Sequence, residues 1–226
     1  MIEAVVFDFD GVIADTEPLH FRSFRDVLSE EGVGLTEADY YARYLGLSDA
    51  AAFRAIRDER AQHWTAGRLG DLIARKAVRF EQLERGSSVL FHGAEQFVRD
   101  AAAAVPIAVA SGARRAEILR ILDDADLTRC FIAIIAAEDV AASKPSPDPY
   151  LRSLHALSAS VGRTIAPKRS VAIEDSARGI ESARAAGLKT IAVTRSAGSP
   201  TSAYADLVVD GLTSLTFTDL RALVRD

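Results

Sequence analysis

Short, nearly continuous apolar runs rich in Val and Ile recur along the chain. The first, Ile2 to Phe7, has the pattern of a strand that is buried on both faces of a parallel sheet. Segments of helical periodicity alternate with the later runs, which indicates a parallel sheet covered by helices. The later strands are predicted at Val105 to Ala110, Phe131 to Ile135, Ser170 to Ile173, Thr190 to Val193 and, as a weaker edge candidate, Leu207 to Val209. The helices of this part are predicted at Ala94 to Ala104, Ala113 to Leu122, Pro149 to Ser158 and Ala177 to Ala186.

The stretch from about residue 18 to residue 86 departs from this alternation, because it contains helical periodicity and no buried-strand pattern. An all-helical insertion after the first strand of an α/β domain suggests a separate, lid-like module. We therefore predict an α/β core made of residues 1–15 and 87–226 and a helical domain made of residues 16–86. Its helices are predicted at Leu19 to Glu31, Glu37 to Leu45, Ala50 to Trp64 and Arg68 to Arg85.

Composition narrows the class of protein. The 226 residues are 49% hydrophobic, which is enough for a full core. The formal net charge is −5 and the basic residues are spread along the chain, so we expect no nucleic-acid partner. The apolar runs are too short to span a membrane, and acids within the first ten residues exclude a signal peptide. Cys130 is the single cysteine, which excludes an internal disulfide. We expect a cytoplasmic protein, a monomer or a weak dimer.

Acidic residues follow the first and the fourth of the predicted strands. Asp8 and Asp10 come after the first apolar run, and Glu174 and Asp175 follow Ile173. Ligands of open α/β sheets bind beyond the carboxyl ends of the strands, so these four side chains should meet at one edge. They would repel one another strongly unless a cation bound there or some were protonated. A few carboxylates completed by water and a substrate phosphate fit Mg²⁺ better than calcium or zinc. The sequence therefore predicts a Mg²⁺ site.

The spacing of Asp8 and Asp10 suits two carboxylates with different tasks, because at an extended strand end their side chains share a face. One can attack phosphorus to give an aspartyl phosphate, while the other protonates the leaving oxygen and later deprotonates water. Lys144 can offset negative charge, and Ser111 with the Gly112 amide can donate hydrogen bonds to phosphoryl oxygens. Each of these residues alone is as readily a solvated or helix-capping side chain. Their occurrence in order, each after its own strand, indicates a catalytic site.

Four sequence motifs carry a resemblance to a known superfamily. They are Asp8 to Glu17 (DFDGVIADTE), Ala110 to Gly112 (ASG), Lys144 to Tyr150 (KPSPDPY) and Glu174 to Gly187 (EDSARGIESARAAG). Over essentially its whole length the sequence resembles the haloacid dehalogenase superfamily, and the β-phosphoglucomutase-like proteins in particular. The resemblance implies a Rossmann-like, three-layer core with a small helical cap inserted after the first strand. Asp10 favours phosphoryl over halide chemistry, because the true dehalogenases of this superfamily lack that second aspartate.

The resemblance also implies a role for each matching position. Asp8 corresponds to the nucleophile and a Mg²⁺ ligand, and Asp10 to the acid/base residue, whose carbonyl also binds the metal. Asp175 corresponds to a direct metal ligand and Glu174 to a ligand or a partner of one. The remaining matches are Ser111 and Lys144 as phosphate-binding residues and Thr16 at the hinge.

Whether water or a sugar hydroxyl accepts the phosphoryl group depends on the helical domain. The β-phosphoglucomutases resemble this chain at His20 and Lys76, but they carry basic residues around the loop that here reads Leu45 to Asp49, centred on Gly46. Leucine and aspartate there remove the charge that a second phosphate needs, and Asp49 would repel it. His20 has a packing and capping alternative, and Lys76 has a solvated alternative.

We therefore predict a Mg²⁺-dependent phosphatase that hydrolyses a small phosphorylated metabolite, a sugar phosphate or similar compound. A β-phosphoglucomutase-type phosphomutase is the alternative. A non-catalytic phosphate-binding relative is a third, and the intact set of Asp8, Asp10, Lys144 and Asp175 argues against it.

Overall fold

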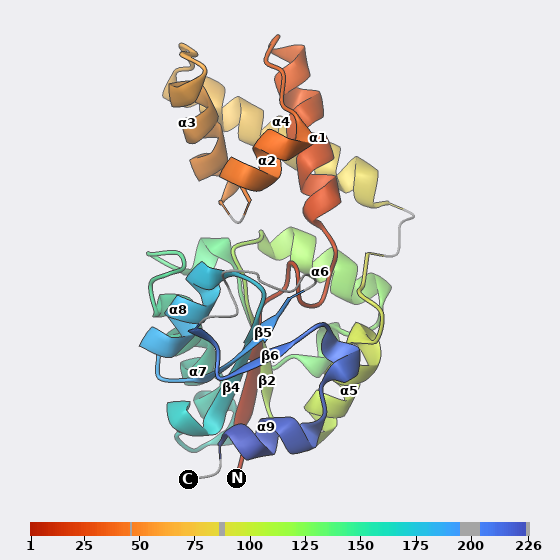
Figure 1. Cartoon of the computed structure of the whole chain (residues 1–226), viewed down its shortest axis with the longest axis vertical. Coiled ribbons are helices and arrows are strands. Elements are labelled where there is room, and N and C mark those ends of the chain that lie inside the picture. Colours follow the sequence, from red (N-terminus) through yellow and green to blue (C-terminus); the bar gives the residue numbers. More distant parts are fainter. Residues whose placement is uncertain (46, 86–88, 195–203, 225–226) are drawn as a thin grey trace. The chain divides into compact units, whose positions relative to one another are not determined.

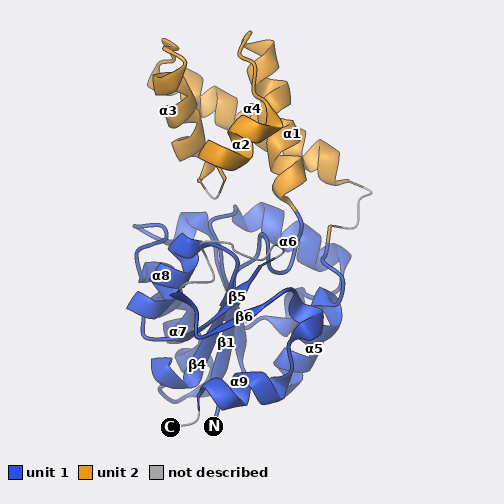
Figure 2. Cartoon of the chain, viewed as in Figure 1, with its two compact units in different colours: residues 1–15, 90–226 blue, residues 16–89 orange. Residues whose placement is uncertain are grey.

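The chain forms two compact units in the computed structural model, which describes residues 1–45, 47–85, 89–194 and 204–224. The first unit combines Met1–Asp15 with Leu90–Asp226, and the second is Thr16–Val89 (Figure 2). We refer to them as the core unit and the helical unit. In the described part of the chain, no helix is long and apolar enough to cross a membrane.

The core unit is built on a parallel six-stranded sheet with the order β3-β2-β1-β4-β5-β6 (Figure 1). All six strands lie within or next to the apolar runs that predicted them, and the weak edge candidate is the edge strand β6. The α/β fold class is therefore confirmed. The strands are β1 (Ala4–Phe7), β2 (Ile107–Ala110), β3 (Ala133–Ile135), β4 (Ser170–Glu174), β5 (Lys189–Val193) and β6 (Leu207–Val209).

Helices cover both faces of this sheet, because alternate residues of the central strand point to opposite sides. Ala4 and Val6 of β1 pack in one cluster with residues of α7 (Asp148–Val161) and α8 (Ala177–Ala185). On the other face, the Phe7 ring meets the Phe97 ring of α5 (Ala94–Ala104) edge to face, with centroids 6.1 Å apart. The core unit thus has the three layers of a Rossmann-like fold.

Two further helices complete the core unit, and one of them was not predicted. α6 (Arg115–Asp124) begins two residues later than expected. α9 (Phe217–Leu223) lies beyond the last predicted strand, and its Phe217 ring stacks on Phe97 with centroids 6.2 Å apart. Thr216 and Asp219 form a capping box at the start of α9, so a sequence signal for this helix was present.

The helical unit contains no strand among its described residues. α1 and α4 begin two residues before the predicted start, and α3 ends at Glu59, five residues before its predicted end. Phe24, Tyr40, Phe53 and Leu72 belong to its apolar core. The helices are α1 (Glu17–Glu30), α2 (Glu37–Arg43), α3 (Asp49–Glu59) and α4 (Ala66–Glu84).

Candidate active site

The carboxylates predicted to share one sheet edge come from two neighbouring strands. Asp8 follows β1, and Glu174 ends β4, immediately before Asp175. β1 pairs with β4 in a register that places Phe7 opposite Ile173. The Asp8 amide continues this ladder, because it donates a hydrogen bond to the Ile173 carbonyl at 2.9 Å. Residues far apart in the sequence therefore meet where the two strands end.

Asp8, Glu174 and Asp175 each offer a carboxylate oxygen within 4.8 Å of the others. Asp8 and Glu174 are buried. Burial, together with the charges of Glu174 and Asp10, outweighs the opposing effect of Lys144 and raises the pKa of Asp8 to about 7. Burial and the charges of Asp8 and Glu174 likewise raise the pKa of Asp175 well above its ordinary value.

Lys144 balances part of this negative charge. Its ammonium group donates to Asp8 Oδ1 at 2.7 Å and to Glu174 Oε1 at 2.5 Å. Burial alone would lower the pKa of Lys144, but the two carboxylates raise it above its ordinary value. The loop that carries Lys144 is fastened to α8, since Arg178 donates to the Lys144 carbonyl at 2.6 Å and Ser182 to the Ser146 carbonyl at 2.5 Å.

The donor set fits Mg²⁺. Three clustered carboxylates with one lysine leave an excess of negative charge. Burial first, and then this charge, raises the pKa of Asp8 and of Asp175. A hard divalent cation with oxygen ligands would relieve it. Asp10 is not among the three clustered carboxylates. Its backbone instead forms a bridge with Ala14, and its charge contributes to the raised pKa of Asp8.

Two glycines allow these carboxylates to lie where they do. Gly11 has a φ of +79°, and a Cβ there would be 1.9 Å from Asp175 Oδ2. Gly179, in the first turn of α8, would place a Cβ 1.9 Å from Glu174 Oε1. Neither Gly179 nor Tyr150 was predicted as a site residue. The Tyr150 hydroxyl donates to Glu174 Oε1 at 2.6 Å. Tyr150 lies in the motif KPSPDPY and Gly179 in the motif EDSARGIESARAAG, so a sequence signal for both residues was present.

Ser111 and Gly112 follow β2, the strand on the other side of β1. The Ser111 side chain is buried, and its Oγ accepts a hydrogen bond from the Ala113 amide at 3.0 Å. Gly112 is exposed, with no atom within 4 Å of the place a Cβ would take. An exposed backbone at a strand end is open to a ligand that accepts hydrogen bonds.

In the helical unit, Lys76 and His20 are in contact. Lys76 Nζ lies 2.6 Å from His20 Nδ1 and 2.8 Å from Asp49 Oδ1. The Lys76 side chain is 0% exposed, so the solvated alternative for this residue is wrong. Burial first, and then the charge of Lys76, lowers the pKa of His20 well below its ordinary value. A charged lysine can only donate, so the unprotonated Nδ1 of a neutral His20 accepts a hydrogen bond from the ammonium group.

Asp49 was expected to repel a second phosphate, but its negative charge is offset by the paired ammonium group of Lys76. The two residues come from α3 and α4, so only the packing of these helices brings them together. Thr16 is buried, and its carbonyl accepts from the Leu19 and His20 amides. Gly46 lies outside the described residues.

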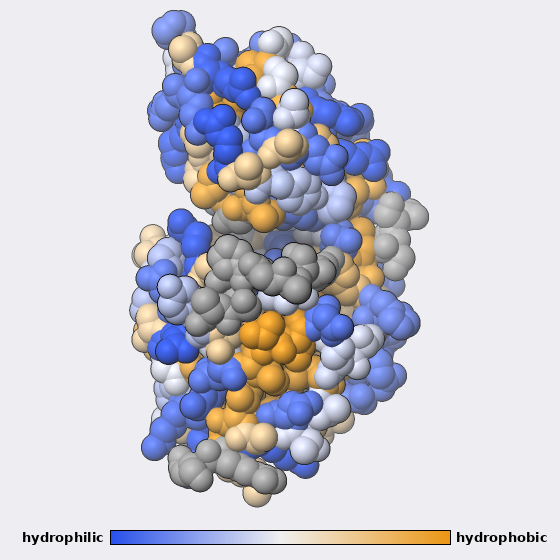
Figure 3. All heavy atoms as spheres, in the orientation of Figure 1, coloured by the Kyte–Doolittle hydropathy of each residue, from blue (hydrophilic) through white to orange (hydrophobic). Residues whose placement is uncertain are grey.

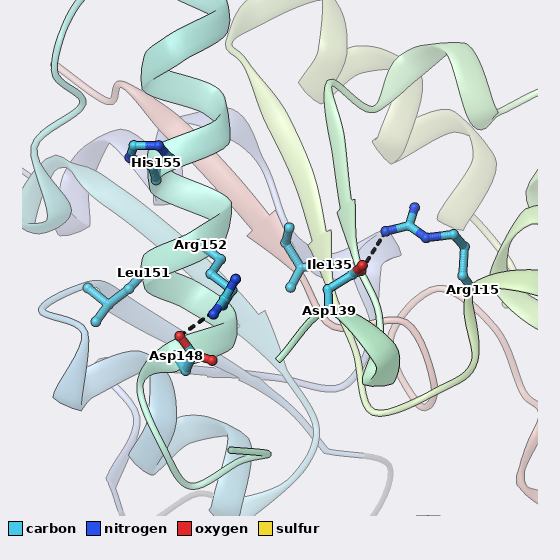
Figure 4. A pocket seen from close by; sticks show the side chains of 7 residues that line it. All are labelled: Arg115, Ile135, Asp139, Asp148, Leu151, Arg152 and His155. Carbon is cyan, nitrogen blue, oxygen red and sulfur yellow. Dashed lines mark hydrogen bonds and ion pairs between the residues drawn. The ribbon is translucent and has the colours of Figure 1, made fainter. Parts of the chain in front are cut away.

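A separate hollow of about 530 Å³ opens at the edge strand β3 (Figure 4). Asp139 and Asp148 in its wall are each paired with an arginine, Arg115 at 2.5 Å and Arg152 at 3.0 Å. None of the clustered carboxylates lines it.

An apolar patch covers part of the core unit over β6, whose Val208 is 41% exposed (Figure 3).

Comparison with known proteins finds a matching family and, among the relatives of this chain, named phosphatases. The family described as haloacid dehalogenase-like hydrolases matches residues 5–193. The phosphorylated carbohydrates phosphatase of Thermotoga maritima is 30% identical over 192 residues, 84% of each chain. Hexitol phosphatase B of Escherichia coli is 30% identical over 224 residues, 97% of this chain and 96% of the relative. The crystal structure of CbbY from Rhodobacter sphaeroides in complex with phosphate superposes with a TM-score of 0.86 at 26% identity, covering 98% of this chain and 100% of that one.

Proposed function

Because this chain belongs to the haloacid dehalogenase-like hydrolase family, we propose that it is a Mg²⁺-dependent phosphatase of a small phosphorylated metabolite, a sugar phosphate or similar compound. The observation that carries the proposal is the contact of Lys144 with Asp8 inside a cluster of three carboxylates. A buried lysine held against a carboxylate can bind the oxygens of a phosphoryl group that the carboxylate attacks. The named phosphatases among the relatives support the same class of substrate.

In the proposed reaction, an oxygen of Asp8 attacks phosphorus, and the bond from phosphorus to the leaving oxygen breaks. Asp10 donates a proton to that oxygen, so the product leaves as an alcohol. Asp10 then takes a proton from water, whose oxygen attacks the phosphorus of the aspartyl phosphate. Breaking the bond between phosphorus and Asp8 releases inorganic phosphate and restores both carboxyl groups. The full cycle is hydrolysis of a phosphate monoester.

Asp8, Glu174 and Asp175, with the backbone carbonyl of Asp10, are the residues proposed to hold Mg²⁺. When bound, the ion offsets the negative charge of the carboxylates and of the phosphoryl group. Lys144 holds Asp8 Oδ1, and this contact restricts the orientation of the nucleophile. Ser111 and the Gly112 amide are proposed to donate to the remaining phosphoryl oxygens.

The helical unit is proposed to act as the cap, with Thr16, His20, Gly46 and Lys76 as its hinge and substrate residues. The contact between Lys76 and Asp49 favours hydrolysis over the mutase alternative. A second phosphate on the substrate would need a net positive partner, and an ion pair provides none. The neutral ion pair, rather than repulsion by Asp49, is therefore the reason to favour water as the acceptor.

Release of p-nitrophenol from p-nitrophenyl phosphate, with and without Mg²⁺, tests the proposed activity. We expect turnover by the wild type with Mg²⁺ and loss of it in the presence of EDTA. A panel of phosphorylated metabolites then identifies the substrate class. An inactive wild type, under conditions in which another phosphatase of the family releases product, would contradict the proposal.

A further inference from the structure

Tyr150 is a fully buried polar residue for which the proposed reaction has no role. It lies in the first turn of α7, is 0% exposed and packs in the apolar cluster beneath the sheet. Its hydroxyl donates to Glu174 Oε1 at 2.6 Å. Its ring lies beside Lys144, whose Nζ is 5.4 Å from the ring centroid. The Tyr150 side chain thus contacts both the carboxylate of Glu174 and the ammonium group of Lys144.

Glu174 Oε1 accepts two hydrogen bonds at once. Tyr150 and Lys144 donate to the same oxygen, at 2.6 Å and 2.5 Å. The other oxygen, Oε2, accepts from the amides of Asp175 and Ser176 and from the Ser176 hydroxyl, at 3.1 to 3.3 Å. Both oxygens of this 0% exposed carboxylate are therefore engaged by the protein.

Lys144 is shared between two acceptors, Glu174 Oε1 and Asp8 Oδ1. A donor that stabilises the charge on Oε1 weakens the attraction of Glu174 for the ammonium group. The Tyr150 hydroxyl is such a donor, at 2.6 Å from Oε1. The balance of Lys144 between its two acceptors then depends on this hydroxyl.

We propose that Tyr150 is a positioning residue, whose hydroxyl occupies Glu174 Oε1 so that Lys144 stays available to Asp8 and to the phosphoryl oxygens. The inference rests on the proposed function, which makes Lys144 a phosphate-binding residue. Without the hydroxyl, Glu174 holds Lys144 more strongly and withdraws it from a bound phosphate. The Mg²⁺ ligands keep their charge, so affinity for the metal does not fall.

The variant Tyr150→Phe removes the hydroxyl and keeps the ring that packs in the core and faces Lys144. Titration calorimetry with inorganic phosphate in saturating Mg²⁺, and with Mg²⁺ alone, separates the two affinities. We expect the phosphate Kd of the variant to rise about fivefold, as for the partial loss of one charge-assisted hydrogen bond. The Mg²⁺ Kd should stay within about twofold of the wild-type value. The matched control is Tyr204→Phe, since Tyr204 is 67% exposed, and both constants should remain unchanged in it.

A purely structural role for Tyr150 would weaken both affinities together, and that result overturns the inference. An unchanged phosphate Kd in Tyr150→Phe overturns it as well, as does a wild type that binds no phosphate. Because the readout is binding, it does not depend on turnover. A wild type that binds phosphate but hydrolyses no ester contradicts the proposed function alone, and the selective loss of phosphate affinity in Tyr150→Phe would still support the role of Tyr150.

Discussion

Gly179 and Glu174 are in such close contact that a Cβ at position 179 would lie 1.9 Å from the carboxylate. The first turn of α8 therefore packs directly against a fully buried acid at the end of β4. Ser176 strengthens the arrangement, because its hydroxyl donates to Glu174 and accepts from the Gly179 amide at 3.0 Å. The position of the carboxylate depends on the absence of a side chain in the helix.

Replacing Gly179 with alanine should displace Glu174 and lower both stability and phosphatase activity. We expect the free energy of unfolding to fall by about 1–3 kcal/mol, the usual cost of overpacking. The matched control is Gly70→Ala in α4, where nothing lies within 4 Å of the new methyl group. That variant should gain about 0.5–1 kcal/mol from the higher helix propensity of alanine. Urea denaturation measures the free energy of unfolding of both variants. Equal changes in the two variants would contradict the close contact between Gly179 and Glu174.

Replacing Asp8 with asparagine should reduce kcat for p-nitrophenyl phosphate by at least about 10³-fold, because the amide cannot serve as the nucleophile. Asp10→Asn should slow turnover by about 10²–10⁴-fold, the range for loss of a general acid and base. Asp58→Asn is the control, since the Asp58 side chain is 65% exposed in the helical unit. An active Asp8→Asn enzyme would refute the assignment of the nucleophile.

Mg²⁺ affinity should depend on pH through Asp8, whose pKa of about 7 lies above its ordinary value of 3.8. Below pH 7 the ion must displace a proton from Asp8, so its Kd should rise by at least about tenfold for each unit of falling pH. The raised pKa of Asp175 acts in the same direction. In the absence of Mg²⁺, the raised pKa makes Asp8 destabilise the protein increasingly as pH rises from 3.8 to about 7.

Calorimetric titration from pH 5 to pH 8 measures the metal affinity, and thermal unfolding with and without Mg²⁺ measures the linked stability. The rise in melting temperature caused by Mg²⁺ should be larger at pH 8 than at pH 5. A pH-independent Kd would show that no proton is released when the metal binds.

The contact between Lys76 and Asp49 should contribute to the stability of the helical unit. Asp49→Asn leaves the ammonium of a 0% exposed lysine without its counter-charge, which should cost about 2–4 kcal/mol, since the Asp49 side chain is 18% exposed. The double variant Asp49→Asn/Lys76→Met should recover most of this loss. A double-mutant cycle analysed by urea denaturation measures the coupling, and additive effects would mean that the pair contributes nothing.

The mutase alternative predicts rapid formation of glucose 6-phosphate from β-glucose 1-phosphate and a bisphosphate primer. We expect little of this product and release of inorganic phosphate instead, because Lys76 is already paired with Asp49. A coupled glucose 6-phosphate dehydrogenase assay beside a phosphate assay separates the two outcomes. Isomerisation faster than hydrolysis would reverse the choice of acceptor.

Hydrophobic periodicity predicted the elements of the fold well, because buried parallel strands and amphipathic helices have distinct patterns. It predicted the end of α3 too late. The helix ends at Glu59, and Ala61 has a φ of +50°, which is outside the helical range. α9 was missed although Thr216 and Asp219 carry a capping signal, because the segment is short and follows a weak edge strand.

The candidate site was predictable to the extent that strand ends determine it. Asp8, Glu174 and Asp175 come together because β1 lies beside β4 and their carboxyl ends coincide. Lys144 reaches them from a loop that is hydrogen-bonded to α8. The burial of Lys76 was not predictable, because its partner comes from another helix and nothing in the spacing of the two residues indicates contact. The contact of Tyr150 with Glu174 was not predictable either, because an aromatic residue in the first turn of α7 is equally consistent with simple packing.

The central position of β1 has a consequence for how the protein is made. β1 precedes the other strands in the chain, yet its neighbours in the sheet are β2 and β4, with Val5 opposite Ile107 and Val171. Such sequence-distant pairing forms slowly. A nascent chain still lacking β4 holds Asp8 without Glu174 and Asp175, so the cluster of three carboxylates cannot form until β4 has left the ribosome. If the proposed function is correct, we expect no phosphatase activity before that point.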